Sequence, residues 1–255
     1  MRTIWRYVRL YQASILFVLA LTVGWELWVW LSGVQRFILP PPSLVFTTLF
    51  TRWSLIYFHA QITFLEVLGG FTLGVTVGML AAVIMSRSAA LNRTFYPLVV
   101  ASQTFPKEAL APLFIVLIGF GILPKILIAA MISFFPVTIN TARGLESADL
   151  LDKDLFRSIA ASKWQTFVKL ELPSAVPFIF TGLKMSATLS VIGAVVGEFV
   201  GASRGLGYLT QKGIDELQTE LMFASLIVLG CMGVLLYSVV EIVERFGFRK
   251  YAAQK

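Results

Sequence analysis

The sequence predicts an all-α membrane protein, a polytopic bundle of about six transmembrane helices. Hydrophobic residues make up 57% of the 255 residues and charged residues only 14%, whereas soluble domains carry about 25% charged residues. Apolar runs of about 20 residues, the length that crosses a bilayer as a helix, recur along the chain. Polar segments separate these runs, and the longest of them, residues 143–176, is predicted to contain an amphipathic helix.

The composition excludes several classes of enzyme. Cys231 and His59 are the only residues of their kinds, so one chain can form neither a disulfide, nor a cysteine metal cluster, nor a histidine-rich metal site. The sequence also lacks the GxxxxGK[ST] phosphate loop, the GxSxG nucleophile elbow and the HExxH zinc pair. A membrane enzyme would have to rely on carboxylates such as Glu26 or Glu66. We therefore expect no catalytic residue, no metal site and no cofactor bound by this chain.

Residues 1–61 are predicted to form an N-terminal span and an extracytoplasmic segment. The apolar run Ser14–Leu31 follows a basic start and is longer than the core of a signal peptide. No small-x-small cleavage site follows it, so we expect a retained span. The prolines at 40–42 then break the chain, and Ser43 is predicted to cap a short helix that ends near Trp53.

Residues 62–250 are predicted to form the transmembrane domain. In the second span, about Thr63–Met85, Gly70, Gly74 and Gly78 recur at four-residue steps. Such a face of small residues lets two helix backbones approach closely. We expect this face to pack inside the bundle, and a seam between two copies of the chain is the alternative.

The third span, about Phe95–Ile118, is predicted to be irregular. Pro106 and Pro112 interrupt it, and Lys107 and Glu108 lie near its middle. A charge at bilayer depth costs about 2.5–3.5 kcal/mol, so such residues usually face a bundle interior or a water-filled path. Two interpretations remain open, because a helix that enters the membrane only after Pro106 would leave both charges at an interface.

The fourth span is predicted at about Pro124–Asn140, the fifth at about Pro177–Val200 and the sixth at about Leu221–Val243. Along the fifth span, one narrow stripe faces a pathway and an opposite glycine face packs on a neighbouring helix. Lys184 belongs to this stripe, and the alternative to a place on the pathway is that its long side chain extends to the cytoplasmic interface. The stripe consists of Lys184, Thr188, Val191, Val195 and Glu198, and the glycines are Gly193 and Gly197.

The distribution of Lys and Arg predicts the orientation. With the N-terminus inside, 14 of the 21 Lys and Arg residues lie in cytoplasmic segments and five lie outside. This asymmetry follows the positive-inside rule, so both termini and the segment 143–176 are predicted to be cytoplasmic. The net charge of +7 is thus a signal of topology and does not indicate nucleic-acid binding.

The segment 143–176 carries apolar residues at three- and four-residue steps, which predicts an amphipathic helix between two spans. Leu172-Pro173 and Pro177 are predicted to end this helix, because proline removes a backbone donor and disfavours helical geometry in the residue before it. The apolar stripe needs a surface to cover it. Its members are Phe156, Ile159, Ala160, Trp164, Phe167 and Val168.

This segment resembles the cytoplasmic coupling loop of bacterial ABC importer permeases, whose signature is Glu-Ala-Ala, three residues, Gly, nine residues, Ile-x-Leu-Pro. Placing its Leu-Pro on Leu172-Pro173 puts Leu170 at the Ile position, Ala160 at the Gly position and Asp154 at the Glu position. Leu155 and Phe156 then depart from Ala-Ala. Three further stretches resemble the nitrate, taurine and aliphatic-sulfonate branch: 160–164, 106–113, and Glu198 followed by Gly205-Leu206-Gly207. The resemblance covers about residues 62–245.

The resemblance implies the permease subunit of a type I importer that works as a homodimer in the bacterial inner membrane. Two separate ABC ATPase subunits, which carry ATP and Mg, would hold the coupling helices, and an extracytoplasmic solute-binding protein would deliver the solute. The residues expected to couple to the ATPase are Asp154, Phe156, Ile159, Ala160, Ala161, Ser162, Trp164, Phe167, Leu172 and Pro173. The residues expected to line the translocation pathway are Gln103, Lys107, Glu108, Thr188 and Glu198, although Glu198 has the alternative of a structural clasp.

The branch implies a small organic or inorganic anion as solute, such as a sulfonate, taurine or nitrate. An aromatic or pyrimidine-type compound is the alternative within the same class of importer. A membrane channel is the alternative from another class, but a channel has no need of a helix that docks on an ATPase.

Overall fold

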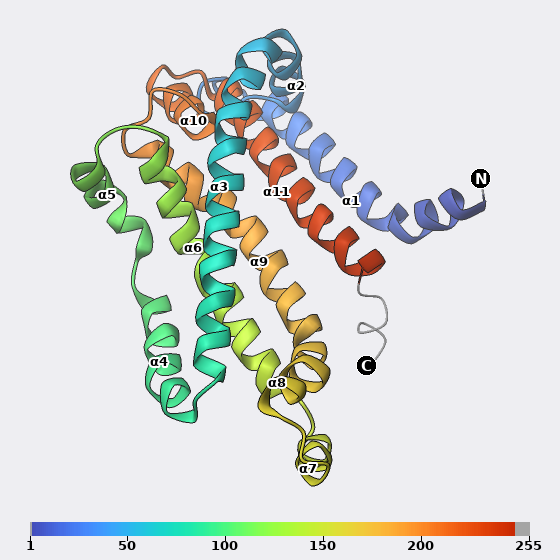
Figure 1. The fold of residues 1–255 in the computed structure, drawn as a ribbon. Coiled ribbons are helices and arrows are strands. Elements are labelled where there is room, and N and C mark those ends of the chain that lie inside the picture. The colour runs from blue at the N-terminus through green and yellow to red at the C-terminus, as the bar shows by residue number, and fades with distance from the viewer. Residues whose placement is uncertain (1, 248–255) are drawn as a thin grey trace. The chain divides into compact units, whose positions relative to one another are not determined.

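The computed structural model describes residues 2–247, and all regular secondary structure in that range is helical (Figure 1). The predicted all-α fold class is confirmed. The elements are α1 (Arg2–Ser32), α2 (Pro42–Thr51), α3 (Trp53–Ser86), α4 (Ala89–Ala101), the 3-10 turns η1 (Ser102–Thr104) and η2 (Lys107–Leu110), α5 (Ala111–Ile118), α6 (Ile122–Glu146), α7 (Leu150–Ser158), α8 (Lys163–Thr166), the π-helical turn η3 (Phe167–Glu171), α9 (Leu172–Phe199), α10 (Leu206–Asp215) and α11 (Thr219–Gly247).

Five helical stretches in this range are long and apolar enough to cross a membrane. They correspond to the first, second, fourth, fifth and sixth predicted spans, and the stretch that contains α8, η3 and α9 is continuous. Their bounds are Gln12–Ser32, Trp53–Ser86, Ile122–Glu146, Lys163–Phe199 and Thr219–Gly247.

The predicted third span, about Phe95–Ile118, is not one helix. α4 and α5 cover its two ends with 13 and 8 residues, and η1 and η2 lie between them. Phe105 is extended, with φ −76° and ψ 132°, because the ring of Pro106 disfavours helical geometry in the residue before it. The predicted irregularity of the third span is therefore confirmed, and five rather than six of the predicted spans are continuous helices in the described residues.

Two compact units make up the chain. The first comprises the residues up to Phe58 together with Leu209–Ile227, and the second comprises His59–Tyr208 and the residues from Val228 onward. The first unit therefore contains α1 and α2, and the second contains α4 to α9. Both units contribute residues to α3, α10 and α11.

In the first unit, a carboxylate of α1 binds the start of α2. The backbone N–H of Ser43 donates to Oε2 of Glu26 at 2.9 Å, and the hydroxyl of Ser43 donates to Oε1 at 2.8 Å. Pro41 holds the N-cap position of α2 without a side-chain cap, so the prediction that Ser43 caps the helix is wrong. A negative charge at a helix N-terminus is stabilising, which gives Glu26 a structural role.

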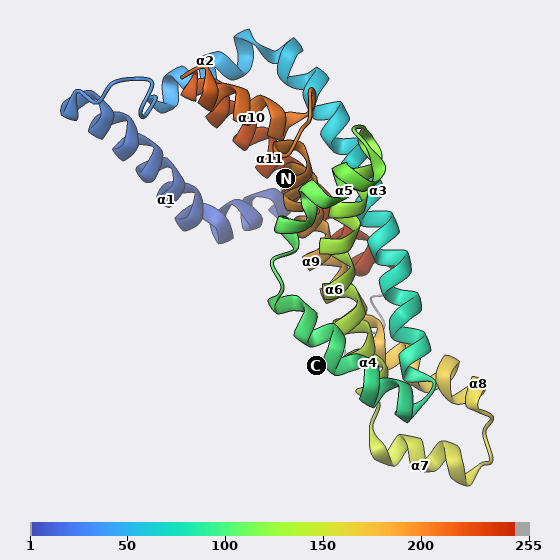
Figure 2. The same cartoon turned by 90° about the vertical axis from the view of Figure 1, so that its left-hand side faces the viewer.

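In the second unit, α6 packs directly on both α3 and α9, and the three helices lie side by side (Figures 1 and 2). A Cβ on Gly74 of α3 would lie 2.5 Å from the carbonyl oxygen of Ala130, and a Cβ on Gly193 of α9 would lie 2.6 Å from Cα of Ala129. Both glycine faces thus contact α6 within one chain. The predicted internal packing of the first face and the predicted neighbour for the second are confirmed.

The N-terminal end of the fifth span differs from the prediction. Leu172-Pro173 and Pro177 do not end a helix, because the helix continues from Lys163 to Phe199. Pro173 lies in the first turn of α9, directly after the π-helical turn η3. Pro173 is thus placed where the helix changes from π-helical to α-helical geometry, and π-helical turns are irregularities that occur inside α-helices.

Replacing Gly74 with alanine is expected to destabilise the packing of α3 on α6. Overpacking costs about 1–3 kcal/mol, whereas alanine gains up to about 1 kcal/mol over glycine in helix propensity. Gly230→Ala in α11 is the matched control, since a Cβ there meets no atom within 4 Å. The melting temperature of the purified protein should fall for Gly74→Ala and hold or rise for Gly230→Ala. Equal melting temperatures for the two variants would contradict the close packing.

Candidate functional site

The helix α7 presents an apolar face that the described part of the chain leaves uncovered. Leu151 is 78% exposed, Leu155 is 57% exposed, and Ile159, just after the helix, is 66% exposed. The side chain of Asp149 caps the helix by accepting from the backbone N–H of Leu151 at 2.9 Å. Figures 1 and 2 show α7 beyond the C-terminal ends of α3 and α6 and the N-terminal end of α9, in the loop that joins α6 to α8.

The predicted amphipathic helix is interrupted at Ala160. This residue has φ +52°, a conformation that favours glycine, and it stands at the Gly position of the coupling-loop signature. A second helix then starts at Ser162, whose hydroxyl accepts from the backbone N–H of Gln165 while the Gln165 side chain accepts from the backbone N–H of Ser162. The prediction of one continuous helix is wrong, and the apolar stripe is divided between α7 and the residues after Ser162.

The residues after the break fall into an exposed group and a packed group. Trp164 is exposed and lies beside Phe167, with 5.8 Å between their ring centroids. Phe167 is buried against Leu145 and Ala175, and the guanidinium of Arg87 lies 3.9 Å from its ring centroid. Phe167 therefore ties the segment to the ends of α6 and α9, whereas Trp164 faces outward.

The remaining predicted coupling residues are divided in the same way. Leu172 packs on the cluster around Phe167, and Pro173 belongs to the first turn of α9. Asp154 forms an exposed ion pair with Arg157 at 3.1 Å. Phe156 and Ala161 are half-buried, whereas Ile159, Ala160 and Ser162 are exposed.

Four of the five predicted pathway residues lie at or near the surface of the chain. Lys107 is half-buried, with Nζ 4.5 Å from the ring centroid of Phe135 and 3.4 Å from the carbonyl oxygen of Gln103. Gln103 and Glu108 are exposed. Thr188 is exposed in a pocket of about 260 Å³ between α9 and α11.

Lys184 in the same pocket has a partner on α11. Its ammonium group lies 2.6 Å from Oε2 of Glu244, and the two side chains are 21% and 17% exposed. Nζ of Lys184 also lies 6.0 Å from the ring centroid of Tyr237. The polar stripe of α9 thus meets an acidic residue from α11 that the sequence did not link to it.

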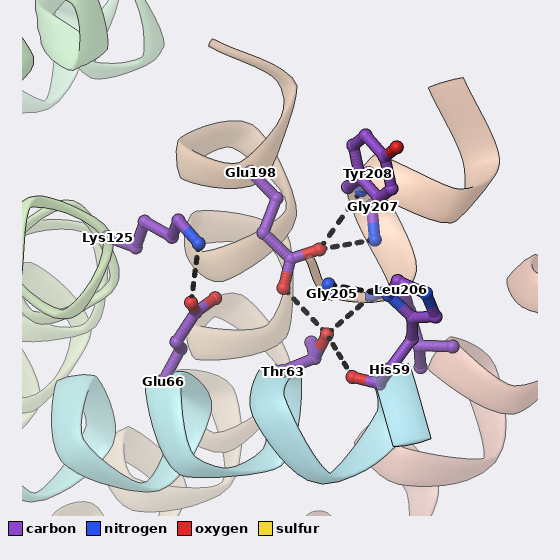
Figure 3. Close-up of polar contacts among 9 residues, drawn as sticks. All are labelled: His59, Thr63, Glu66, Lys125, Glu198, Gly205, Leu206, Gly207 and Tyr208. Atoms are coloured by element: carbon purple, nitrogen blue, oxygen red, sulfur yellow. Dashed lines mark hydrogen bonds and ion pairs between the residues drawn. The ribbon is translucent and has the colours of Figure 1, made fainter. Parts of the chain in front are cut away.

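Glu198, the fifth predicted pathway residue, is buried with 1% exposure. Its Oε1 accepts from the hydroxyl of Thr63 at 2.6 Å. Its Oε2 accepts from the backbone N–H groups of Gly207 and of Tyr208, the latter at 3.2 Å (Figure 3). These partners correspond to the alternative role of a structural clasp.

Two side chains of α3 complete the binding of the N-terminus of α10. The backbone N–H of Leu206 donates to Oγ1 of Thr63 at 2.7 Å, and the backbone N–H of Gly205 donates to Nδ1 of His59 at 2.9 Å (Figure 3). The first amides of a helix have no intrahelical acceptor, and glycine at 205 offers no side chain to cap them. We refer to His59, Thr63 and Glu198 together as the α10 clasp.

A buried ion pair lies next to the α10 clasp. Nζ of Lys125 in α6 lies 2.8 Å from Oε1 of Glu66 in α3, and the Glu66 side chain is fully buried. Sequence reasoning missed this pair, although Glu66 was noted as a carboxylate within an apolar span. An ionisable residue at membrane depth is a functional-site hypothesis by default, and applying that rule to Glu66 would have found it.

Comparison with known proteins gives one sequence family and several related permeases. The family described as "Binding-protein-dependent transport system inner membrane component" matches residues 74–250. A formylaminopyrimidine transport permease, ThiX, of Halalkalibacterium halodurans is 36% identical over 92% of this chain and 95% of its own. A putative aliphatic sulfonates transport permease, SsuC, of Bacillus subtilis is 32% identical over 87% of this chain and 81% of its own.

A solved structure shows the same fold. It is described as an amino acid ABC transporter with histidines, and it superposes with a TM-score of 0.63 over 78% of this chain and 97% of that chain. The sequence identity is 16%, so the match concerns the fold alone.

Replacing Gly205 with alanine is expected to loosen the α10 clasp. Gly205 has φ +117°, and a Cβ there would overlap the carboxylate of Glu198. Gly119→Ala is the matched control, because Gly119 has φ +93° with no atom within 4 Å of a Cβ. Both variants carry backbone strain of about 1–2 kcal/mol, but only Gly205→Ala adds a cost of overpacking, about 1–3 kcal/mol. Hydrogen exchange of the Gly207 and Tyr208 amides should accelerate in Gly205→Ala alone. Unchanged exchange would contradict the clasp.

Proposed function

Because the chain belongs to the family of binding-protein-dependent transport system inner membrane components, we propose that two copies of it form the translocation pathway of one importer. The predicted class is confirmed: the chain is the multi-pass membrane permease subunit of an ATP-driven ABC importer, a transporter subunit and not an enzyme. In the proposed assembly, two separate ATPase subunits bind from the cytoplasm with ATP and Mg. An extracytoplasmic binding protein delivers the solute, and both termini of the permease are cytoplasmic.

The uncovered apolar face of α7 is the observation that carries the proposed assembly. Leu151, Leu155 and Ile159 expose apolar area beyond the ends of the membrane spans, where water rather than lipid would surround them. A groove on the ATPase subunit would cover this face. Trp164 is exposed beside it and would serve as an aromatic anchor, as aromatic residues often do in interfaces.

A basic pocket adjoins the docking surface and suits an acidic segment of the ATPase. The pocket has a volume of about 310 Å³. Four cations line it, with Glu171 as the one acidic residue of the lining. The four cations are Arg87, Lys153, Arg157 and Lys163.

The chain segments on either side of α7 would provide a route from the ATPase to the membrane helices. α7 follows α6 after three residues, and the buried ring of Phe167 packs on Leu145 of α6 and on Ala175 and Ile179 of α9. A displacement of α7 would therefore move the inner ends of α6 and α9 together. ATP and loaded binding protein would each shift the equilibrium between inward- and outward-facing states by their different affinities for the two states.

The pathway between two copies would be lined by the irregular segment after α4 and by the stripe of α9. Lys107 supplies a cation next to the aromatic face of Phe135, which suits a small anion such as a sulfonate, taurine or nitrate. Lys107 would offset part of the negative charge of the solute, which matters because burying an unpaired charge is costly. Gln103, Glu108 and Thr188 would add polar groups to this path.

A pyrimidine-type or other aromatic solute is a second candidate. It is favoured by the identity of 36% to the formylaminopyrimidine permease, compared with 32% to the aliphatic-sulfonate permease of Bacillus subtilis. The rings of Phe134 and Phe135, with centroids 5.0 Å apart, would offer stacking surfaces beside Lys107.

Replacing Leu151 and Leu155 with serine is expected to weaken assembly with the ATPase subunit. Buried apolar anchors of an interface contribute about 2 kcal/mol or more, which corresponds to about thirtyfold in affinity. Co-purification and titration of the ATPase against the permease in nanodiscs measure the effect. Asp152→Ser on the same helix is the control and should bind as wild type. Wild-type affinity of the double variant would show that α7 does not dock there.

Replacing Lys107 with methionine is expected to abolish uptake of an anionic solute while assembly and basal ATP hydrolysis persist. The solute is first identified as the compound, from a panel of sulfonates, nitrate and pyrimidines, that protects the binding protein from thermal unfolding. Transport into proteoliposomes is then measured for wild type, for Lys107→Met and for the control Lys169→Met, which replaces an exposed lysine of η3. Unchanged uptake in Lys107→Met would remove Lys107 from the pathway.

A further inference from the structure

The groups around the α10 clasp contain more buried negative charge than positive charge. Glu66 and Glu198 are both fully or almost fully buried, and Lys125 is the cation bound to Glu66. Nδ1 of His59 accepts a hydrogen bond from the backbone N–H of Gly205, so this nitrogen carries no proton and the ring is neutral. Tyr208 of α10 stacks on the His59 ring, with 5.7 Å between centroids. If both carboxyl groups were ionised, the cluster would hold one uncompensated negative charge at membrane depth.

The partners of Glu198 identify it as the ionised carboxyl group. The hydroxyl of Thr63 donates to Oε1, and the backbone N–H groups of Gly207 and Tyr208 donate to Oε2. All three partners are donors, and a proton on either oxygen would compete with them. A carboxylate accepts at both oxygens and matches this set.

Glu66 has the complementary pattern. Its Oε1 accepts from Lys125 at 2.8 Å, but Oε2 is buried and no donor among the described residues reaches it. Thr63 and Glu66 are three residues apart on α3 and therefore share a face of the helix. Figure 3 shows the second oxygen of Glu66 on the side of Glu198. An orphaned acceptor here thus faces a carboxylate, and a buried unsatisfied group costs free energy.

We propose that Glu66 holds a proton on Oε2 and donates it in a hydrogen bond to Glu198, so that the cluster is a proton-binding site. The proton satisfies the orphaned oxygen and reduces the buried charges to one carboxylate and one ammonium group. It also removes the repulsion that a second carboxylate would exert on Glu198, the group that holds the N-terminus of α10. The proton therefore helps to fasten α10 to α3 and α9, which goes beyond the transport function proposed above.

The first test is the infrared spectrum of the purified permease–ATPase complex in H₂O and D₂O. Wild type should show the absorption of a protonated carboxyl group, and Glu66→Gln should lose it. Glu244→Gln, which changes the carboxylate paired with Lys184, is the control and should retain it. If no band depends on Glu66, the proposal is overturned. This result is expected if Glu66 is ionised and a buried water binds its Oε2. Loss of the band in Glu198→Gln but not in Glu66→Gln would show that Glu198 carries the proton, which would contradict the proposal.

The second test compares the two glutamine variants, which should behave differently. In Glu66→Gln, the amide NH₂ can donate to Glu198 while the amide oxygen accepts from Lys125, so the variant imitates a protonated glutamic acid. In Glu198→Gln, the NH₂ group is itself a donor and would face the donors of Thr63, Gly207 or Tyr208. Because these hydrogen bonds are lost, hydrogen exchange of the Gly207 and Tyr208 amides should accelerate at least about tenfold. Glu66→Gln should keep the wild-type exchange rate and melting temperature. Destabilisation of Glu66→Gln, or its failure to accumulate, would contradict a bound proton.

Discussion

The close approach of α6 to α3 and α9 is the constraint on which the second unit depends. Gly74 and Gly193 leave no room for a side chain between their backbones and α6. Helices in a membrane gain little from the hydrophobic effect between them, so packing of small residues and interhelical hydrogen bonds hold them together. Ser186 of α9 and Ser133 of α6 add such a bond, at 2.6 Å from the Ser186 hydroxyl to the Ser133 carbonyl oxygen. Three helices in such contact move together rather than slide freely.

Four ionisable side chains within the membrane spans, Glu66, Lys125, Lys184 and Glu198, are each bound by a partner from another helix. Glu66 and Lys125 join α3 to α6, Glu198 joins α9 to α3 and α10, and Lys184 joins α9 to α11. Unpaired, such groups would be costly in lipid. The ionisable residues therefore help to fix which helices are neighbours, and Gly74 and Gly193 fix how closely α3 and α9 approach α6.

The sequence allowed the fold class, five of the spans and the internal role of the glycine faces to be predicted, because these depend on apolar length and residue spacing. It also located the segment of α7 through the coupling-loop signature. Predictions from local sequence rules were wrong at positions where tertiary packing determines the backbone conformation. Pro173 lies at the start of α9 rather than at the end of a helix, and Ala160 adopts a conformation that alanine rarely takes. The hydrogen bond between Glu198 and Thr63 could not be read from spacing, because the two residues lie 135 positions apart.

Both ends of α9 are joined to other elements of the second unit. At one end the helix is continuous with η3, whose Phe167 packs on α6, and at the other end Glu198 binds the first amides of α10. The continuous helix Lys163–Phe199 has 37 residues, which corresponds to about 55 Å at 1.5 Å per residue. In the proposed importer, a rigid element of that length would transmit a shift at its N-terminal end to the clasp at its other end. Glu198 is well placed for this role because its carboxylate is fully engaged by the protein, whereas a residue that contacts solute needs a free polar group. The geometry thus favours transmission of movement over solute binding for Glu198, and leaves solute contact to the exposed groups around Lys107 and Thr188.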